Sequence, residues 1–121
     1  MRLFALRGAN CVEANEARAI LGATTQLVRE MMTRNSLDAE SMVSCIFTLT
    51  DDLNAEFPAV AARKLGLSSV PLLCTREVPV PGSLPRVIRA LVHYYAAEDH
   101  RPQHVYLGEA RVLREDLNSA Q

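Results

Sequence analysis

The residues from Val70 to Arg89 constrain the fold of this chain more than any other stretch. An apolar segment ends in the sequence Cys-Thr-Arg-Glu at residues 74–77, and a second apolar segment begins at Val87 and carries Arg89. The prolines and the glycine between them exclude both a regular helix and a central strand. A thiol, a carboxylate and a guanidinium at the ends of core strands serve no packing purpose. We therefore expect these groups to help line a pocket for a small anion.

Alternating apolar and polar residues predict five strands, over residues 2–7, 42–50, 70–77, 87–95 and 104–107. In the first of these, Phe4 and Leu6 share one face, whereas Leu3, Ala5 and Arg7 share the other. An arginine on a partly buried face requires an anionic partner, because an unpaired buried charge is costly. Gly8 follows this strand and is expected to ease a turn. Cys45, within the second strand, is expected to be a small core residue.

Two helices are predicted, over residues 16–34 and 57–66. The first has apolar residues at the i, i+3, i+4, i+7 spacing, with Asn15 as its expected N-cap and Asn35 in the left-handed position at its end. The second begins with Pro58 in its first turn and ends at Gly66. It lies between two predicted strands and therefore forms a crossover unit.

These elements indicate an α+β fold in a single domain, residues 1–121: a mixed five-stranded sheet with two main helices on one face. Two helices cannot cover both faces of such a sheet, so a second subunit is expected on the other face. The polar tail after Arg114 is expected to fray.

The composition excludes several classes of function. The formal net charge is −1, tryptophan is absent and aromatic residues make up 5% of the chain, so we expect neither nucleic-acid nor membrane binding. The cysteines, Cys11, Cys45 and Cys74, are odd in number and include no CxxC, which favours a reducing cytoplasm over a disulfide framework or a zinc site. The charged N-terminus does not resemble a signal peptide. Asp51 and Asp52 favour a capping or solvated loop over a metal site.

The motifs of the common catalytic classes, namely GxSxG, Walker A, HExxH and GxGxxG, do not occur in the sequence. The histidines, His93, His100 and His104, do not have metal-ligand spacing. Cys74 has no obvious base beside it that would make it a nucleophile. Composition and spacing alone therefore predict only a soluble α+β domain that binds an anion.

A set of ordered segments carries the interpretation further. They are Arg7-Gly8-Ala9, residues 52–59 (Asp-Leu-Asn-Ala-Glu-Phe-Pro-Ala) with Arg63, residues 70–77 (Val-Pro-Leu-Leu-Cys-Thr-Arg-Glu), residues 84–89 (Leu-Pro-Arg-Val-Ile-Arg), residues 104–107 (His-Val-Tyr-Leu) and residues 112–114 (Val-Leu-Arg). Together they resemble the AroH class of chorismate mutase, the trimeric Bacillus-type enzyme, over nearly the whole chain. Val60 and Asn54 depart from the pattern, which has Lys at the first position and often His at the second.

The resemblance implies the rearrangement of chorismate to prephenate in aromatic amino acid biosynthesis. This unimolecular reaction uses no nucleophile, no proton transfer and no cofactor, which agrees with the missing motifs. The enzyme would hold a flexible dianion in its compact reactive conformer and stabilise the charge that separates as the ether C–O bond breaks. Guanidinium groups suit both tasks.

The resemblance also assigns roles to individual residues. Arg89 would be the main cation at the ether oxygen, Glu77 would meet the ring and its hydroxyl group, and Arg7 would bind a carboxylate with help from Tyr106. Cys74 would be a pocket residue near that hydroxyl. The remaining residues would form apolar walls or cations at the mouth: Phe57, Ala59, Leu72, Leu73, Arg63 and Arg114. If Cys74 and Glu77 both touch one ligand, the strand must bend near Thr75, because residues three apart in a strand face opposite ways.

The family forms homotrimers with pockets between subunits, which implies that Phe57, Ala59 and Arg63 of one copy meet Arg7, Glu77, Arg89 and Tyr106 of the next. Two alternatives stay open at this point. One is an imine or enamine hydrolase of similar trimeric architecture, and the other is a non-catalytic trimer that binds a small anion.

Overall fold

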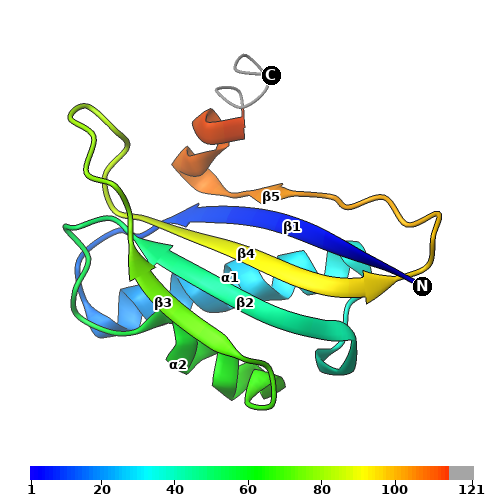
Figure 1. The fold of residues 1–121 in the computed structure, drawn as a ribbon. Helices are drawn as coiled ribbons and strands as arrows, with labels where there is room; N and C mark the ends of the chain where they lie inside the picture. Colours follow the sequence, from blue (N-terminus) through cyan, green and yellow to red (C-terminus); the bar gives the residue numbers. More distant parts are fainter. Residues whose placement is uncertain (115–121) are drawn as a thin grey trace.

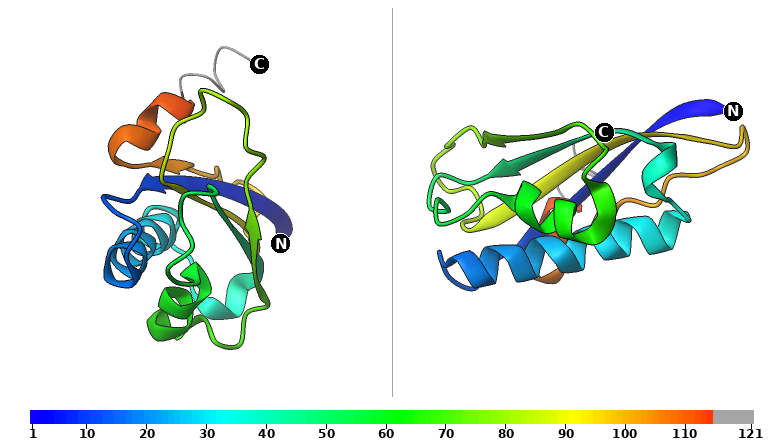
Figure 2. Two further views of the ribbon diagram at one scale, coloured as in Figure 1. Left: turned by 90° about the vertical axis from the view of Figure 1, so that its left-hand side faces the viewer. Right: turned by 90° about the horizontal axis from the view of Figure 1, so that it is seen from below.

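The computed structural model describes residues 1–114 and contains one five-stranded sheet with its two main helices on one side. The strand order is β3-β2-β4-β1-β5. The strands are β1 (Arg2–Cys11), β2 (Met42–Leu49), β3 (Leu72–Arg76), β4 (Val87–Ala96) and β5 (Val105–Tyr106). Figure 2 shows α1 (Ala17–Asn35) and α2 (Pro58–Ala62) against the same face of the sheet. The predicted α+β architecture is thereby confirmed, and among residues 1–114 no helix is long and apolar enough to cross a membrane.

Strand β1 is longer than predicted, and Gly8 lies inside it instead of easing a turn. Gly8 pairs with Ala90 of β4 on one side and with Val105 of β5 on the other. A Cβ atom at this position would lie 2.4 Å from Sδ of Met31 and 3.0 Å from Cδ1 of Leu27, both on α1. The absence of a side chain therefore lets α1 pack closely against the sheet, directly beside the Arg7 backbone.

We expect Gly8→Ala to destabilise the fold by about 1–3 kcal/mol, because the added methyl group overpacks the contact with α1. Gly22→Ala is the matched control: Gly22 lies exposed on α1, and no atom lies within 4 Å of a Cβ built there. This control should stabilise the protein by up to about 1 kcal/mol through helix propensity. Urea denaturation of both variants measures the difference, and equal free energies of unfolding would refute the packing argument.

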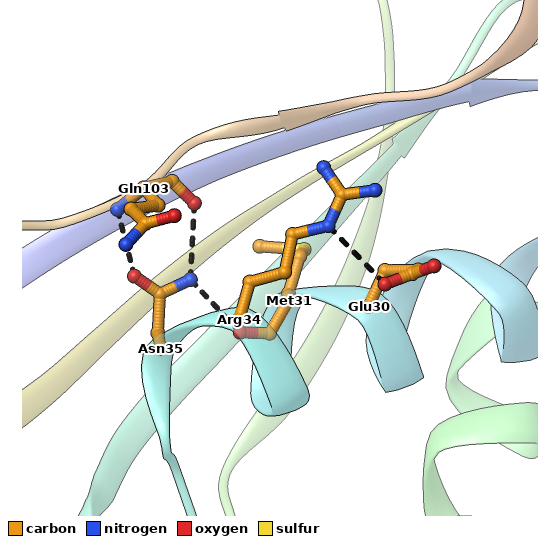
Figure 3. A network of polar contacts seen from close by, with 5 residues as sticks. All are labelled: Glu30, Met31, Arg34, Asn35 and Gln103. Atoms are coloured by element: carbon orange, nitrogen blue, oxygen red, sulfur yellow. Dashed lines mark hydrogen bonds and ion pairs between the residues drawn. The ribbon is translucent and has the colours of Figure 1, made fainter.

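The ends of α1 differ from the prediction. The N-cap is Glu16, without a side-chain hydrogen bond, while Asn15 Oδ1 accepts from the backbone N–H groups of Asn54 and Ala55. At the other end the left-handed residue is Ser36, with φ at 53°. The Asn35 side chain instead donates to Met31 O and Gln103 O and accepts from Gln103 N, which ties α1 to the segment before β5 (Figure 3). The Asn15 and Asn35 side chains therefore bond to distant segments of the chain, although their residue types had suggested helix caps.

The chain between β2 and β3 forms the expected crossover, because these two strands are parallel and α2 lies between them. Pro58 begins α2, and the helical turn η2 (Arg63–Leu67) ends the segment with Gly66 at a φ of 95°. A register shift between Met42 and Ser44 buries Met42 and leaves Val43 exposed, so Val43 does not share the buried face of Cys45 and Phe47 as strict alternation would require. Two further turns, η1 (Ala39–Ser41) and η3 (Gly108–Ala110), and a helical turn at residues 111–114 complete the described chain. The predicted fraying tail lies outside it.

The two faces of the sheet have different surroundings. Phe4, Leu6, Phe47, Ile88 and Val92 lie beneath the helices in the main core, which also contains Cys45 as predicted. Burial raises the pKa of the Cys45 thiol to about 12. We call the opposite side the open face, because neither α1 nor α2 covers it. Its end at Ala9 and Val87 is buried by Ala110 and Leu113, from the helical turns that follow β5. The rest of the face carries the alternate side chains of the strands, including Leu3, Arg7, Ile46, Leu73, Arg89, Leu91 and Tyr95.

Candidate active site

The open face holds a row of residues that crosses all five strands. Thr75 of β3 pairs with Thr48 of β2, Thr48 pairs with Arg89 of β4, Arg89 pairs with Ala9 of β1, and Ala9 pairs with Tyr106 of β5. Because Ile88 and Ala90 are buried in the core, the alternation of β4 projects Arg89 from the open face.

Arg89 forms an ion pair with Glu77, which follows β3. The Arg89 Nε atom lies 3.2 Å from Oε2 of Glu77, and the same carboxylate accepts a hydrogen bond from the Thr48 hydroxyl group. The Glu77 backbone N–H donates to Leu49 O at 2.8 Å, which extends the pairing of β3 by one residue. The Arg89 side chain is 44% exposed, so this pair contributes little to stability.

A cavity of about 230 Å³ lies over the row of residues that contains Thr48, Arg89 and Tyr106. We call it the open-face cavity. It contains four of the predicted site residues, Arg7, Glu77, Arg89 and Tyr106, and its other lining residues are Gly8, Ile46, Thr48, Ala90 and Leu91. Among residues 1–114, Arg7 forms no ion pair, whereas Arg89 shares the single carboxylate of the cavity. Two guanidinium groups and one carboxylate leave an excess of positive charge, which suits an anionic ligand.

Cys74 and Phe57 lie in a second hollow of about 220 Å³, the edge pocket, together with Leu49, Leu53, Thr75 and Arg76. The register of β3 with β2 is regular from Leu72 to Arg76, so no bulge turns Cys74 toward Glu77. Cys74 pairs with Phe47 on the helix side, and Glu77 lies on the open face. Within one chain the structure therefore separates these two predicted ligand contacts.

The other predicted site residues are spread around the two hollows. Ala59 is buried in the main core, and Leu72 is partly buried and packs against this core. Leu73 is 60% exposed on the open face, and Arg63 and Arg114 are exposed. One described chain therefore brings four of the predicted residues into the open-face cavity and two into the edge pocket, but it does not join the two groups.

Two further side chains form hydrogen bonds to the predicted site residues, and no site role was predicted for either of them. The Thr48 hydroxyl group donates a hydrogen bond to the Glu77 carboxylate. The strand alternation of β2, which places Thr48 on the open face, is the sequence signal that could have identified it. His104 accepts a hydrogen bond from the Arg7 backbone N–H at its Nδ1 atom, at 3.0 Å. Burial, and after it the charges of Arg7 and Arg114, lower the pKa of His104 below its usual value.

The loop between Glu77 and Arg89 is closed at its base by an aspartate. The Asp52 carboxylate accepts from the backbone N–H of Arg86, at 3.0 and 3.2 Å for its two oxygens, and from the Thr50 hydroxyl group. Arg86 has a φ of 50°, and the next residue, Val87, donates its backbone N–H to Thr50 Oγ1 at 3.0 Å. Asp52 is therefore a capping residue, which is one of the two roles expected for this acidic loop.

The structure is that of a small α+β protein with a cationic cavity that suits an anion, and comparisons with known proteins identify its family. Residues 3–117 match the family described as chorismate mutase type I. The chain is 50% identical over 118 residues to chorismate mutase AroH of Thermus thermophilus, covering 96% of this chain and 97% of that protein. It is 36% identical over 120 residues to chorismate mutase AroH of Bacillus subtilis (strain 168), covering 98% and 94% of the two chains.

A solved structure agrees with this assignment. The chorismate mutase from Clostridium thermocellum superposes with a TM-score of 0.87 at 44% sequence identity, covering 90% of this chain and 98% of that one. The chain therefore belongs to the type I chorismate mutase family, and the resemblance inferred from its ordered segments is confirmed.

Proposed function

We propose that this chain catalyses the rearrangement of chorismate to prephenate in aromatic amino acid biosynthesis, with the open-face cavity supplying the groups that stabilise the transition state. The observation that carries the proposal is the pair of arginines, Arg7 and Arg89, beside one carboxylate in a cavity of a chain from this family. In the reaction the ether C–O bond breaks while a C–C bond forms, so negative charge grows on the ether oxygen and positive charge on the ring.

Arg89 is the proposed partner of the ether oxygen and of a substrate carboxylate. Its guanidinium group is fixed at Nε by Glu77, which leaves the terminal N–H groups of its planar fork free to bind oxygen atoms. Glu77 is in turn held by Thr48, so its negative charge lies close to the proposed position of the ring. Opposite charges fixed in advance on either side of a polarising bond lower the barrier without reorganisation during the reaction.

Arg7 and Tyr106 are the proposed partners of the second carboxylate. Arg7 has no anionic partner among residues 1–114, so a substrate carboxylate would supply the counter-ion predicted for this side chain. Tyr106 lies in the same cavity and pairs with Ala9, which is two residues from Arg7 on the same face of β1. Two anchored carboxylates restrict the substrate to its compact conformer, which reduces the entropic part of the barrier.

We further propose that the site is completed between copies of the chain in a homotrimer. The open face exposes large apolar side chains, with Leu3 and Tyr95 each 48% exposed and Leu73 60% exposed, which favours burial against another subunit. The edge pocket of one copy, with Phe57, would then meet the open-face cavity of the next. Such an arrangement would let Cys74 and Glu77 touch one ligand although they face opposite ways in one chain, with Ala59, Arg63, Leu72, Leu73 and Arg114 around them. A cytoplasmic location stays a prediction from the three free cysteines.

The direct test is to add chorismate to the purified protein in the presence of EDTA and to follow the loss of its ultraviolet absorbance. We expect conversion to prephenate without any added cofactor. A well-folded trimer that leaves chorismate unchanged would overturn the proposed function.

A further inference from the structure

We propose that His104 is a positioning residue, which in its neutral form accepts the Arg7 backbone N–H and thereby fixes Arg7 and Tyr106 relative to each other. This inference rests on the proposed function, in which these two residues bind one carboxylate. It assigns to His104 no contact with the substrate.

The hydrogen bond from the Arg7 N–H group to His104 replaces a backbone hydrogen bond between β1 and β5. Strand β5 pairs with β1 in parallel at only two positions, Gly8 with Val105 and Ala9 with Tyr106. Next to them, the Arg7 backbone N–H meets the imidazole Nδ1 of His104 at 3.0 Å in place of a carbonyl group. At the other end, Leu107 N donates to Ala9 O at 2.9 Å. Because β5 is so short, the ring accounts for a large part of its attachment next to Tyr106.

The segment that carries His104 is also fixed from the helix layer. Asn35 of α1 makes two hydrogen bonds to the backbone of Gln103, one at 3.0 Å and one at 2.7 Å (Figure 3). The residue before His104 is therefore held by α1, and the residue after it is held by β1. With both neighbours fixed, the imidazole has little freedom to move away from the Arg7 N–H group.

The bond exists only when His104 is neutral. An imidazole nitrogen accepts a hydrogen bond only in the unprotonated state, so Nδ1 must carry the lone pair and Nε2 the proton. The charged groups that act on His104 are the guanidinium groups of Arg7 on β1 and Arg114 after η3, and α1 contributes the neutral Asn35 amide through Gln103. No carboxylate among residues 1–114 pairs with His104. Burial and the two cations lower its pKa, which keeps the acceptor available at neutral pH.

The sign of the pH effect follows from this lowered pKa. The bond is present above the pKa of His104 in the folded protein, and it is lost as the pH falls through that value. Protonation would leave the Arg7 N–H without its acceptor and would add a third positive charge beside Arg7 and Arg114. Acidification should therefore loosen Arg7 and raise KM more than it lowers kcat, because a carboxylate is bound in both the ground state and the transition state.

Two substitutions of similar shape separate positioning from simple packing. In His104→Asn the amide Oδ1 can occupy the place of Nδ1 and cannot be protonated in this pH range, whereas His104→Leu has no acceptor. We expect His104→Leu to lose roughly tenfold in kcat/KM, mainly through KM, at neutral pH. His104→Asn should stay within roughly threefold of the wild type. It should also lack the acidic inflection that we expect for the wild type below the usual histidine pKa of about 6.5.

The experiment is a pH profile of kcat and KM for the three proteins, together with an NMR titration of the Arg7 amide signal. In the wild type this amide should shift with the protonation of the His104 ring, and in His104→Asn it should not. An unchanged acidic inflection in His104→Asn, or a His104→Leu variant equal to the wild type at every pH, would refute the proposal. The amide signal does not depend on turnover, so it reports on the His104–Arg7 bond even if the wild type fails to convert chorismate and the proposed function falls.

Discussion

Replacing Arg89 by alanine is expected to lower kcat for chorismate by about 10³-fold or more, with little change in the fold. The loss follows from the position of the guanidinium group, which is held by Glu77 at 3.2 Å and belongs to a residue that lines the open-face cavity. Removing one preorganised donor from a developing oxyanion costs about 10²–10³-fold, and here a full positive charge is lost as well. Because the Arg89 side chain is 44% exposed, the free energy of unfolding should change by less than about 1 kcal/mol.

Two companion variants sharpen this result. Arg89→Lys keeps the charge but loses the planar fork, so its kcat should lie between those of Arg89→Ala and the wild type. Arg29→Ala removes an exposed arginine from α1, on the far side of the sheet, and should leave kcat unchanged. Steady-state kinetics of the three variants measure these differences in kcat, and circular dichroism checks that each variant is folded. An Arg89→Ala variant with wild-type kcat would show that charge stabilisation comes from another group.

Placing an aspartate at Tyr95 is expected to abolish both assembly and activity. Tyr95 pairs with Leu3 of β1 on the open face, and both side chains are 48% exposed in one chain. In an isolated subunit an acidic side chain at such a position should shift stability by no more than about 0.5 kcal/mol. Against the apolar face of another subunit it would be an unpaired buried charge, which costs several kcal/mol. The proposed site is incomplete without a second copy, so turnover should disappear with the oligomer.

The control for this variant carries the same charge elsewhere. Ala17 is exposed in the first turn of α1, where an added carboxylate is favourable near the helix N-terminus, so Ala17→Asp should remain trimeric and active. Light scattering at micromolar concentration, with activity measured on the same samples, gives the comparison. A Tyr95→Asp protein with wild-type mass and activity would contradict the proposed use of the open face.

The sequence predicted the strands, the main helix and the family more successfully than it predicted local details. The spacing of apolar residues was sufficient to predict that β1 is a strand and α1 a helix, because the buried sides of both elements face one continuous core. It failed at Gly8, since the reason for this glycine is the approach of Met31 from a helix that follows in the chain. It also failed at Asn15 and Asn35, whose side chains bond to segments 39 and 68 residues away in sequence.

The candidate site shows a similar division. Glu77 and Arg89 were expected in an anion pocket from the sequence itself, as was an anionic partner for Arg7, and the resemblance added Tyr106 and the individual roles. These four residues line one cavity because sheet register places them on one face. Thr48 and His104 were missed because their partners are fixed only by that register. The separation of Cys74 from Glu77 followed directly from strand alternation, and it led to the proposal that two copies of the chain share the site.

The most direct test of this shared site is complementation between two inactive variants. Arg89→Ala removes the proposed cation of the open-face cavity, and Phe57→Asp places a negative charge in the edge pocket, where it would repel the substrate dianion. Phe57 is 65% exposed, so its substitution should not disturb the fold. Each variant alone should be nearly inactive.

The two variants should be refolded together in equal amounts and assayed with chorismate. If each site combines the cavity of one copy with the pocket of another, about a quarter of the sites in random mixed trimers contain both intact halves, and a comparable share of wild-type activity should return. If all the essential groups of a site come from a single chain, no mixed trimer contains an intact site. Activity that stays at the level of the separate variants, in trimers shown to be mixed, would contradict the account.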